Sequence, residues 1–207
     1  MSSYELHLIS DGKKSLVEFA EIASHVHPYV TFLHIREKDK TVKEVWEGIE
    51  LLLERGIPKE KIIINDRVDA AAAAGVKGVQ LAYHSLEPKW VKASFPHLRV
   101  GRSVHSAEEA KEMEQQQADF LIYGHIYSSG SKPGLEARGT YALSQVVQTV
   151  RIPVIAIGGI NPERVPSVLQ SGAAGIAVMS GILNAADPVA EVKRYVEALR
   201  GGVLKSE

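Results

Sequence analysis

Residues 153–162 are Pro-Val-Ile-Ala-Ile-Gly-Gly-Ile-Asn-Pro, and residues 175–182 are Gly-Ile-Ala-Val-Met-Ser-Gly-Ile. Each stretch is a short apolar run that ends in a glycine-containing turn. Neither run alternates between apolar and polar residues, so both faces of the two strands should be buried. This pattern indicates parallel strands that are covered by helices.

The same unit recurs along the whole chain. Short apolar segments alternate strictly with longer segments of helical period, and we count eight of each. Strict alternation predicts parallel strands joined by crossover helices, and eight such units can close a (β/α)8 TIM barrel, an α/β fold. A doubly wound open sheet is the alternative, but no Gly-x-Gly-x-x-Gly follows the first strand to favour it. The predicted strands are residues 4–10, 30–35, 61–65, 78–81, 98–102, 119–123, 153–157 and 175–178.

The composition is that of an ordinary soluble domain. Of 207 residues, 45% are hydrophobic, which is enough for one core, and no linker divides residues 1–207. A net charge of −1 gives no electrostatic footprint for nucleic acid or an anionic membrane. The absence of cysteine excludes disulfides, thiolate metal sites and cysteine nucleophiles. Without a signal peptide or a spanning apolar run, we expect a cytoplasmic protein. The sequence leaves a homodimer open.

Two glycine-bearing turns predict a phosphate site. In a barrel of this kind the active site lies at the C-terminal ends of the strands, and phosphate tends to bind after strands seven and eight. Glycine lets backbone N–H groups approach an anion closely. Tight turns with no ligand are the alternative interpretation. The predicted phosphate-binding residues are Gly158, Gly159, Met179, Ser180 and Gly181.

Polar residues collect at the ends of other predicted strands. His34, Arg36 and Lys38 close the second strand, and strand alternation would point the three side chains the same way. Any one polar residue could simply be a solvated surface residue, but their convergence on one barrel face predicts a site. The predicted substrate-binding residues are Arg36, Lys38, Asn65, Ser103 and Lys132, with Glu136 and Arg138 further along the loop that carries Lys132.

His125 is the predicted catalytic residue. It follows Gly124 directly after the sixth strand, and a histidine at the barrel mouth can exchange protons near neutral pH without a metal. A histidine that only hydrogen-bonds to its own loop is the alternative. No spacing of histidines or carboxylates suggests a transition-metal site, so no metal is predicted.

These motifs resemble the thiamin phosphate synthase family along most of the chain. The resemblance rests on His34-Ile-Arg-Glu-Lys38, Ile64-Asn-Asp66, Ile157-Gly-Gly-Ile160 and Gly175-Ile-Ala-Val-Met-Ser180. It implies a magnesium-dependent enzyme that joins a pyrimidine diphosphate to a thiazole phosphate. By position, Arg36, Lys38, Asn65, Asp66, Ser103 and Lys132 match the family's diphosphate-side contacts, and the two glycine turns match its thiazole-phosphate cradle.

Three departures from the family pattern point to one of its branches. This chain has His34 where the synthase has glutamine, Ser85 where it has a magnesium-binding aspartate, and His125 where it has proline. These departures resemble the thiazole tautomerase branch, the TenI-type proteins. The resemblance implies an isomerase without cofactor or metal, in which His125 moves a proton on a carboxylated thiazole phosphate. The alternatives are an active thiamin phosphate synthase, a non-catalytic ligand-binding or regulatory barrel, and a phosphate-binding barrel of another pathway such as an epimerase.

Overall fold

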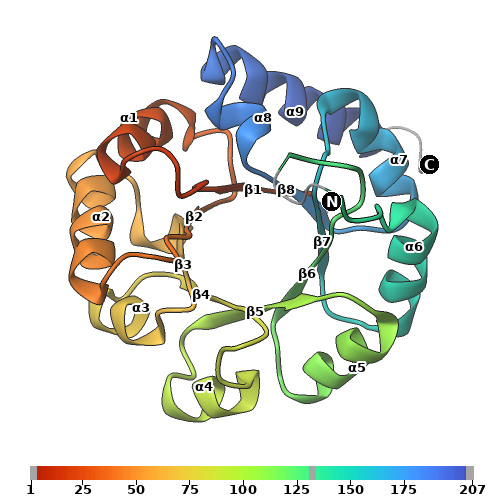
Figure 1. The fold of residues 1–207 in the computed structure, drawn as a ribbon, viewed down its shortest axis with the longest axis horizontal. Coiled ribbons are helices and arrows are strands. Elements are labelled where there is room, and N and C mark those ends of the chain that lie inside the picture. The colour runs from red at the N-terminus through yellow and green to blue at the C-terminus, as the bar shows by residue number, and fades with distance from the viewer. Residues whose placement is uncertain (1–3, 131–133, 204–207) are drawn as a thin grey trace.

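Eight parallel strands form a closed barrel. Each strand pairs with the next one along the chain, and β8 pairs with β1. The helices lie around the outside of this ring (Figure 1). The computed structural model describes residues 4–130 and 134–203. It confirms the predicted (β/α)8 TIM barrel and rules out the open sheet.

The elements of this barrel alternate as the sequence predicts. The strands are β1 Glu5–Ile9, β2 Phe32–Ile35, β3 Ile62–Asn65, β4 Gly78–Leu81, β5 Arg99–Val104, β6 Phe120–Gly124, β7 Val154–Ile157 and β8 Gly175–Val178. The helices are α1 Leu16–Val26, α2 Val42–Glu54, α3 Val68–Ala74, α4 Pro88–Ser94, α5 Ala107–Gln115, α6 Gly139–Thr149, α7 Val165–Gln170, α8 Ser180–Leu183 and α9 Pro188–Val203. Short 3-10 turns cover Lys59–Lys61 and Pro162–Arg164.

The differences from the predicted elements are small and have local causes. β5 continues to Val104, two residues beyond the predicted end at residue 102, because Ser103 and Val104 still pair with β6. α8 was not predicted as a helix, because a single turn is too short for a helical period to show. At the start of α5, the hydroxyl of Ser106 accepts from the N–H of Glu109, which is half of a capping box. The Glu109 carboxylate, however, accepts from the N–H of His105, so the capping box is incomplete.

The strand registers arrange the inward-facing side chains in layers of four from alternate strands. From the lower end upward, these layers are Phe32, Gly78, Phe120 and Gly175; then His7, Ile63, Gly101 and Ile155; then His34, Gln80, Ile122 and Ala177. The top layer, at the C-terminal mouth, is Ile9, Asn65, Ser103 and Ile157. A separate apolar cluster inside the barrel contains most of the apolar members of these layers, which places them on the inside.

A partly buried ionic network fills the lower end of the barrel. Arg99 donates to both carboxylate oxygens of Glu5, at 2.8 and 3.1 Å, and His7 bonds the same carboxylate at 2.7 Å. The Arg99 guanidinium also lies between the rings of Phe32 and Phe120, 4.8 and 4.6 Å from their centroids. Burial alone would raise the pKa of Glu5, but the hydrogen bonds from His7 and Arg99 hold it at about 2.

This network predicts a specific acid sensitivity. The pKa of Glu5 is about 2 in the folded chain, against 4.5 for an unperturbed carboxyl, so its ionised form favours folding above pH 4.5. That contribution to stability is lost as the pH falls from 4.5 to about 2. The free energy of unfolding, measured in urea at a series of pH values, should therefore fall more steeply in the unmodified chain than in a Glu5→Gln variant. Equal slopes would show that the Glu5 carboxylate does not stabilise the fold.

Among the helices that the structure describes, none is both long and apolar enough to cross a membrane.

Candidate active site at the mouth of the barrel

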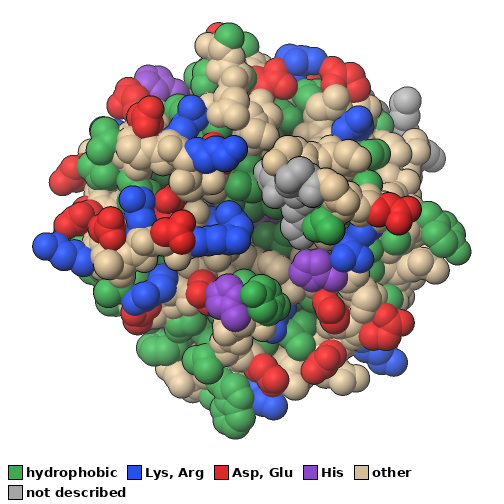
Figure 2. Space-filling model, in the orientation of Figure 1, with side chains coloured by type: hydrophobic (Ala, Val, Ile, Leu, Met, Phe, Trp, Pro, Cys, Tyr) green, Lys and Arg blue, Asp and Glu red, His purple; other side chains and the backbone are tan. Residues whose placement is uncertain are grey.

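The strand ends that carry the predicted site residues surround a hollow at one end of the barrel. Figure 2 shows this face, with lysine and arginine side chains gathered on one side of the hollow and a histidine at its rim. The strands are parallel and the barrel is closed, so the C-terminal ends of β2, β3, β5, β6, β7 and β8 all meet here. The barrel therefore brings the predicted site residues that the structure describes to one mouth.

The end of β2 presents one partly buried cation. Arg36 is half-buried, and its backbone N–H donates to Ser10 Oγ at 2.8 Å. Ser10 Oγ donates in turn to Glu37 at 2.8 Å, which fixes the β1 and β2 loops together. No ion pair of the Arg36 guanidinium occurs in residues 4–130 and 134–203. An arginine at the mouth that makes no ion pair is well placed to bind an anionic ligand.

The other two residues of the His-x-Arg-x-Lys stretch lie elsewhere. His34 is fully buried in the third interior layer, and Lys38 is exposed. β2 ends at Ile35, so strand alternation does not extend to Arg36 and Lys38, and the expectation that all three side chains point the same way stays a prediction.

Asn65 and Ser103 both lie in the top layer, half-buried and facing the mouth. Gln80, one layer below, donates from Nε2 to Ser103 Oγ at 3.1 Å, and its Oε1 is buried without a partner among the described residues. Gln80 was not predicted as a site residue. Its inward position near the end of a strand was the signal that could have identified it.

Asp66 is engaged by its own neighbours. One carboxylate oxygen accepts from Ser85 Oγ and the other lies 3.1 Å from His84 Nε2. Ser85 Oγ also accepts from the N–H of Ala82 at 2.8 Å, so the β4 loop is tied to Asp66. Over the described ranges, no group of three or more His, Cys, Asp and Glu side chains could hold a metal ion.

The predicted phosphate turn after β7 is pinned by its surroundings. Arg164 donates to the carbonyl of Gly159 at 2.5 Å while its guanidinium lies 4.5 Å from the ring centroid of Tyr127. Both glycines have positive φ, +103° at Gly158 and +64° at Gly159. Within the described chain, the N–H groups of Gly159 and Ile160 donate to no acceptor. Two adjacent N–H groups without partners at the mouth suit an anion.

After β8 the chain turns directly into α8. Met179 precedes the helix, and Ser180 and Gly181 form its first turn, where backbone N–H groups have no partner inside a helix. Tyr195 holds this end of the barrel by donating from its hydroxyl to the carbonyl of Ile160 at 2.9 Å. The five predicted phosphate-binding residues thus lie on two adjacent loops, because β7 and β8 are paired.

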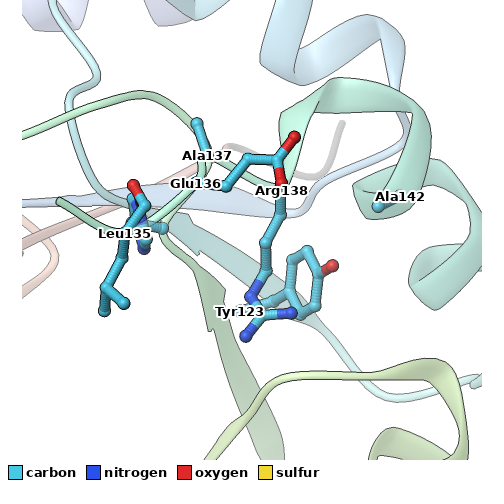
Figure 3. A pocket seen from close by; sticks show the side chains of 7 residues that line it. Tyr123, Leu135, Glu136, Ala137, Arg138 and Ala142 are labelled. Atoms are coloured by element: carbon cyan, nitrogen blue, oxygen red, sulfur yellow. Dashed lines mark hydrogen bonds between the residues drawn. The ribbon is translucent and has the colours of Figure 1, made fainter.

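His125 directly follows β6 and is buried. It lines a pocket of about 480 Å³ together with Tyr123, Leu135, Glu136, Ala137, Arg138 and Ala142, between the end of β6 and the start of α6 (Figure 3). Its Nε2 lies 3.3 Å from the carbonyl oxygen of Leu135, and its Nδ1 is buried without a partner in the described residues. A side chain at Gly158 would overlap the Cβ atom of His125, so glycine there permits this packing.

Arg138 anchors the loop that follows His125. Its guanidinium donates to the carbonyls of Gly124, at 3.1 Å, and His105, at 2.8 Å, and lies beside the ring of Tyr123. Its backbone N–H donates to the carbonyl of His125 at 3.0 Å. Arg138 therefore fixes the loop, with two of its five N–H donors engaged by backbone carbonyls. Lys132, the remaining predicted substrate-binding residue, lies outside the described residues.

Known proteins similar to this chain share its length and fold. The model of the family described as thiamine monophosphate synthase, TMP-TENI, matches residues 6–182. A thiamine-phosphate synthase of Pyrococcus horikoshii is 34% identical over 197 residues, covering 95% of this chain and 93% of that protein. Thiamine-phosphate synthase 1 of Aquifex aeolicus is 33% identical over 201 residues, covering 94% and 91%.

Solved structures are also similar to this chain over most of its length. A thiamine phosphate pyrophosphorylase from Pyrococcus furiosus has a TM-score of 0.81 and 29% identity, with 98% of both chains covered. A 3-hexulose-6-phosphate synthase has a TM-score of 0.74 at 21% identity, over 94% of this chain and 99% of that one, which shows the fold alone.

The names of these relatives correct one prediction from the sequence. The departures at residues 34, 85 and 125 led to an isomerase of the tautomerase branch, but the relatives are named as synthases, which are transferases. These names contradict the isomerase prediction. They support membership of the family, but not of its tautomerase branch. With the family model matching most of its length, the chain belongs to the thiamine monophosphate synthase (TMP-TENI) family.

Proposed function

We propose that this chain is a thiamine-phosphate synthase of thiamine biosynthesis. In this reaction the ring nitrogen of a thiazole phosphate forms a bond to the methylene carbon of an aminopyrimidine diphosphate, and the bond from that carbon to the diphosphate breaks. The observation that carries the proposal is the 34% identity over nearly the whole length to relatives named for this activity. The predicted cytoplasmic location and the question of a homodimer belong to this proposal and remain predictions.

The geometry of the mouth supports two separate anion sites, since β1 lies between β8 and β2. On one side, the turns after β7 and β8 offer backbone N–H groups, including those of Gly159 and Ile160, to the thiazole phosphate. On the other side, Arg36 offers a guanidinium to the diphosphate, with the exposed Lys38 as a second cation. Asn65 and Ser103 lie in the top layer of the barrel as hydrogen-bonding partners for the rings.

These residues would act mainly by binding and orientation. Holding two reactants in line converts a reaction between free molecules into one within a complex, which can account for a large part of a rate enhancement. The cation at Arg36 would stabilise the negative charge that develops on the departing diphosphate. His125, whose buried Nδ1 has no partner among the described residues, is proposed as a ligand contact.

The residues of the mouth do not fit a magnesium ion held by the protein. Magnesium usually takes one or two carboxylates beside substrate phosphates. Here Asp66 is the one carboxylate of the matched pattern, and Ser85 and His84 already occupy both of its oxygens. The proposed chemistry of this chain therefore rests on its cationic side chains and backbone N–H groups. The same observation favours a second candidate, a barrel that binds these ligands without joining them.

A Ser85→Asp variant should create the missing metal site. Two carboxylates facing each other repel when no cation lies between them, so the melting temperature in EDTA should fall below that of the unmodified chain. Added magnesium should raise the melting temperature of the variant and leave that of the unmodified chain nearly unchanged. If magnesium stabilises both proteins equally, the unmodified mouth already holds the ion, and our interpretation of Asp66 is wrong.

Two measurements, ligand binding and diphosphate release, distinguish the synthase from the ligand-binding barrel. Isothermal titration should show that thiazole phosphate binds far more tightly than the same thiazole with a free hydroxyl. Incubation with thiazole phosphate and aminopyrimidine diphosphate should then release diphosphate if the chain is a synthase. Tight binding without any release would overturn the synthase proposal in favour of the ligand-binding barrel.

A further inference from the structure

Tyr195, on α9, contacts both turns of the proposed phosphate site. α9 lies outside the barrel and packs against α7 and α8 (Figure 1). The Tyr195 side chain is buried, with 1% of the residue exposed, and its hydroxyl donates to the carbonyl of Ile160 at 2.9 Å. The same oxygen lies so close to Gly181 that a Cβ atom there would overlap it. One buried hydroxyl therefore touches the turn after β7 and the turn after β8.

The hydroxyl of Tyr195 is a permanent donor. Burial, together with the charges of Glu191 and Glu163, raises the pKa of Tyr195 to about 12. The hydroxyl therefore keeps its proton over the physiological pH range, and a backbone carbonyl oxygen can only accept. The bond to Ile160 thus has one direction, and it holds the Ile160 carbonyl toward α9.

The two preceding carbonyls of the turn after β7 are held in the same way. The carbonyl of Gly158 accepts from the N–H of Tyr127 at 3.0 Å, and the carbonyl of Gly159 accepts from Arg164 Nη1 at 2.5 Å. Arg164 is itself held in place, because its guanidinium lies 4.5 Å from the ring centroid of Tyr127. The three successive carbonyls of residues 158–160 are therefore bound by donors from outside the turn.

A carbonyl that is held in this way also sets the direction of the next N–H group. The C=O and the N–H of a trans peptide point in opposite directions, and the peptide bonds of this turn are trans. The N–H groups that follow the three carbonyls belong to Gly159, Ile160 and Asn161. None of them donates to an acceptor among the described residues. Three successive N–H groups, each directed away from its anchor, suit an anion.

We propose that Tyr195 and Arg164 are positioning residues of the synthase reaction, which hold the carbonyls of Ile160 and Gly159 so that the N–H groups of this turn are already oriented for the phosphate of the thiazole. The identity of the ligand rests on the proposed function. Without the two anchors the peptide groups could rotate, and they would have to be ordered again when the phosphate binds. Neither side chain needs to touch the ligand. Gly181 belongs to the same arrangement, because a side chain there would displace the Tyr195 hydroxyl.

The test compares the affinity for thiazole phosphate with the affinity for the same thiazole bearing a free hydroxyl, by isothermal titration. The ratio of two affinities of one folded protein is not changed by a loss of stability, so it separates positioning from a purely structural role. Tyr195→Phe keeps the packed ring and removes the donor. It should lower the ratio about tenfold, the value of one hydrogen bond to a charged group. Tyr29→Phe removes a hydroxyl from the segment before β2, at the lower end of the barrel, and should leave the ratio unchanged.

Arg164→Met removes the second anchor and should also lower the ratio about tenfold. Arg194→Met is its matched control. Arg194 is exposed on α9, and its guanidinium pairs with Glu163 and Glu191 and with no carbonyl of the turn. Both variants lose one positive charge, but the control should keep the ratio within about twofold of the unmodified chain. An equal fall in both variants would show that Arg164 acts by its charge alone, which contradicts its role as an anchor.

A double variant tests whether Gly181 acts through Tyr195. Gly181→Ala alone should displace the hydroxyl and lower the ratio about as much as Tyr195→Phe does. Added to Tyr195→Phe, it should lower the ratio less than about twofold further, because the hydroxyl is already gone. Losses that multiply would show that the two residues affect the phosphate independently, and would contradict the arrangement that we propose.

These outcomes are distinguishable from a failure of the proposed function. If the unmodified chain binds the two thiazoles equally well, there is no phosphate site at the mouth, and the proposed function is overturned. If the unmodified chain prefers thiazole phosphate and Tyr195→Phe or Arg164→Met keeps the full preference, that residue is not an anchor of the turn. The inference is then contradicted and the synthase proposal stands.

Discussion

A Gly159→Val variant is expected to bind thiazole phosphate roughly a hundredfold more weakly than the unmodified chain, through the loss of one or two hydrogen bonds to a charged group. The φ of Gly159 is +64°, a region that a β-branched residue rarely adopts. A Cβ atom there would lie 2.6 Å from the carbonyl oxygen of Ser128 and 2.8 Å from that of Tyr127. The turn must shift to relieve these overlaps, and its N–H groups shift with it.

The added side chain acts on the phosphate indirectly. Its Cβ atom would meet the loop after β6, so the effect on the phosphate is transmitted by the backbone.

Gly75→Val is the matched control for this variant, since Gly75 has a φ of +62° but open space around it, at the end of α3. It should lower stability and leave the affinity for thiazole phosphate unchanged in isothermal titration. Unchanged affinity in Gly159→Val would place the phosphate elsewhere on the barrel.

An Arg36→Ala variant is expected to bind aminopyrimidine diphosphate roughly a hundredfold more weakly, because a guanidinium can make two charge-assisted hydrogen bonds to a phosphate group. Arg36 is half-buried and has no ion pair in the described chain, so the substitution breaks no ion pair there. Lys38→Ala should have a smaller effect, below about tenfold, because Lys38 is exposed and solvent screens its charge.

Arg55→Ala removes the same charge at the end of α2 and serves as the control. It should leave affinity for the diphosphate unchanged. Thiazole phosphate should bind equally well to Arg36→Ala and the unmodified chain, since its site is proposed at the β7 and β8 loops. Equal loss of affinity for both ligands would show that Arg36 supports the fold of the mouth and does not select the diphosphate.

The barrel could be predicted from the sequence because its signals are local. Runs such as residues 154–157 are apolar on both faces, helices start at capping residues, and strict alternation allows few topologies. The mouth followed from the fold, because parallel strands bring all their C-terminal ends to one side. Element boundaries were less well predicted, since the end of β5 depends on pairing with β6 rather than on its own residues.

The contacts within the site could not be predicted from the sequence. Asp66 is nearly twenty positions from His84 and Ser85 along the chain, and only the pairing of β3 with β4 brings it to them. Likewise, the sequence places His7 and His34 on different strands, and the register alone reveals that their rings share a hydrogen bond. The prediction of an isomerase was wrong for a related reason. It relied on single substitutions, whereas the names of the relatives reflect similarity along the whole chain.

The central claim, that this barrel joins a pyrimidine to a thiazole, is tested most directly by phosphorus NMR of the chain mixed with thiazole phosphate and aminopyrimidine diphosphate. We expect the resonances of the pyrimidine-bound diphosphate to disappear and those of free diphosphate and of thiamine phosphate to grow together, and Arg36→Ala to slow both. Unchanged resonances of both reactants, in the presence and in the absence of magnesium and at concentrations where thiazole phosphate is bound, would contradict the claim.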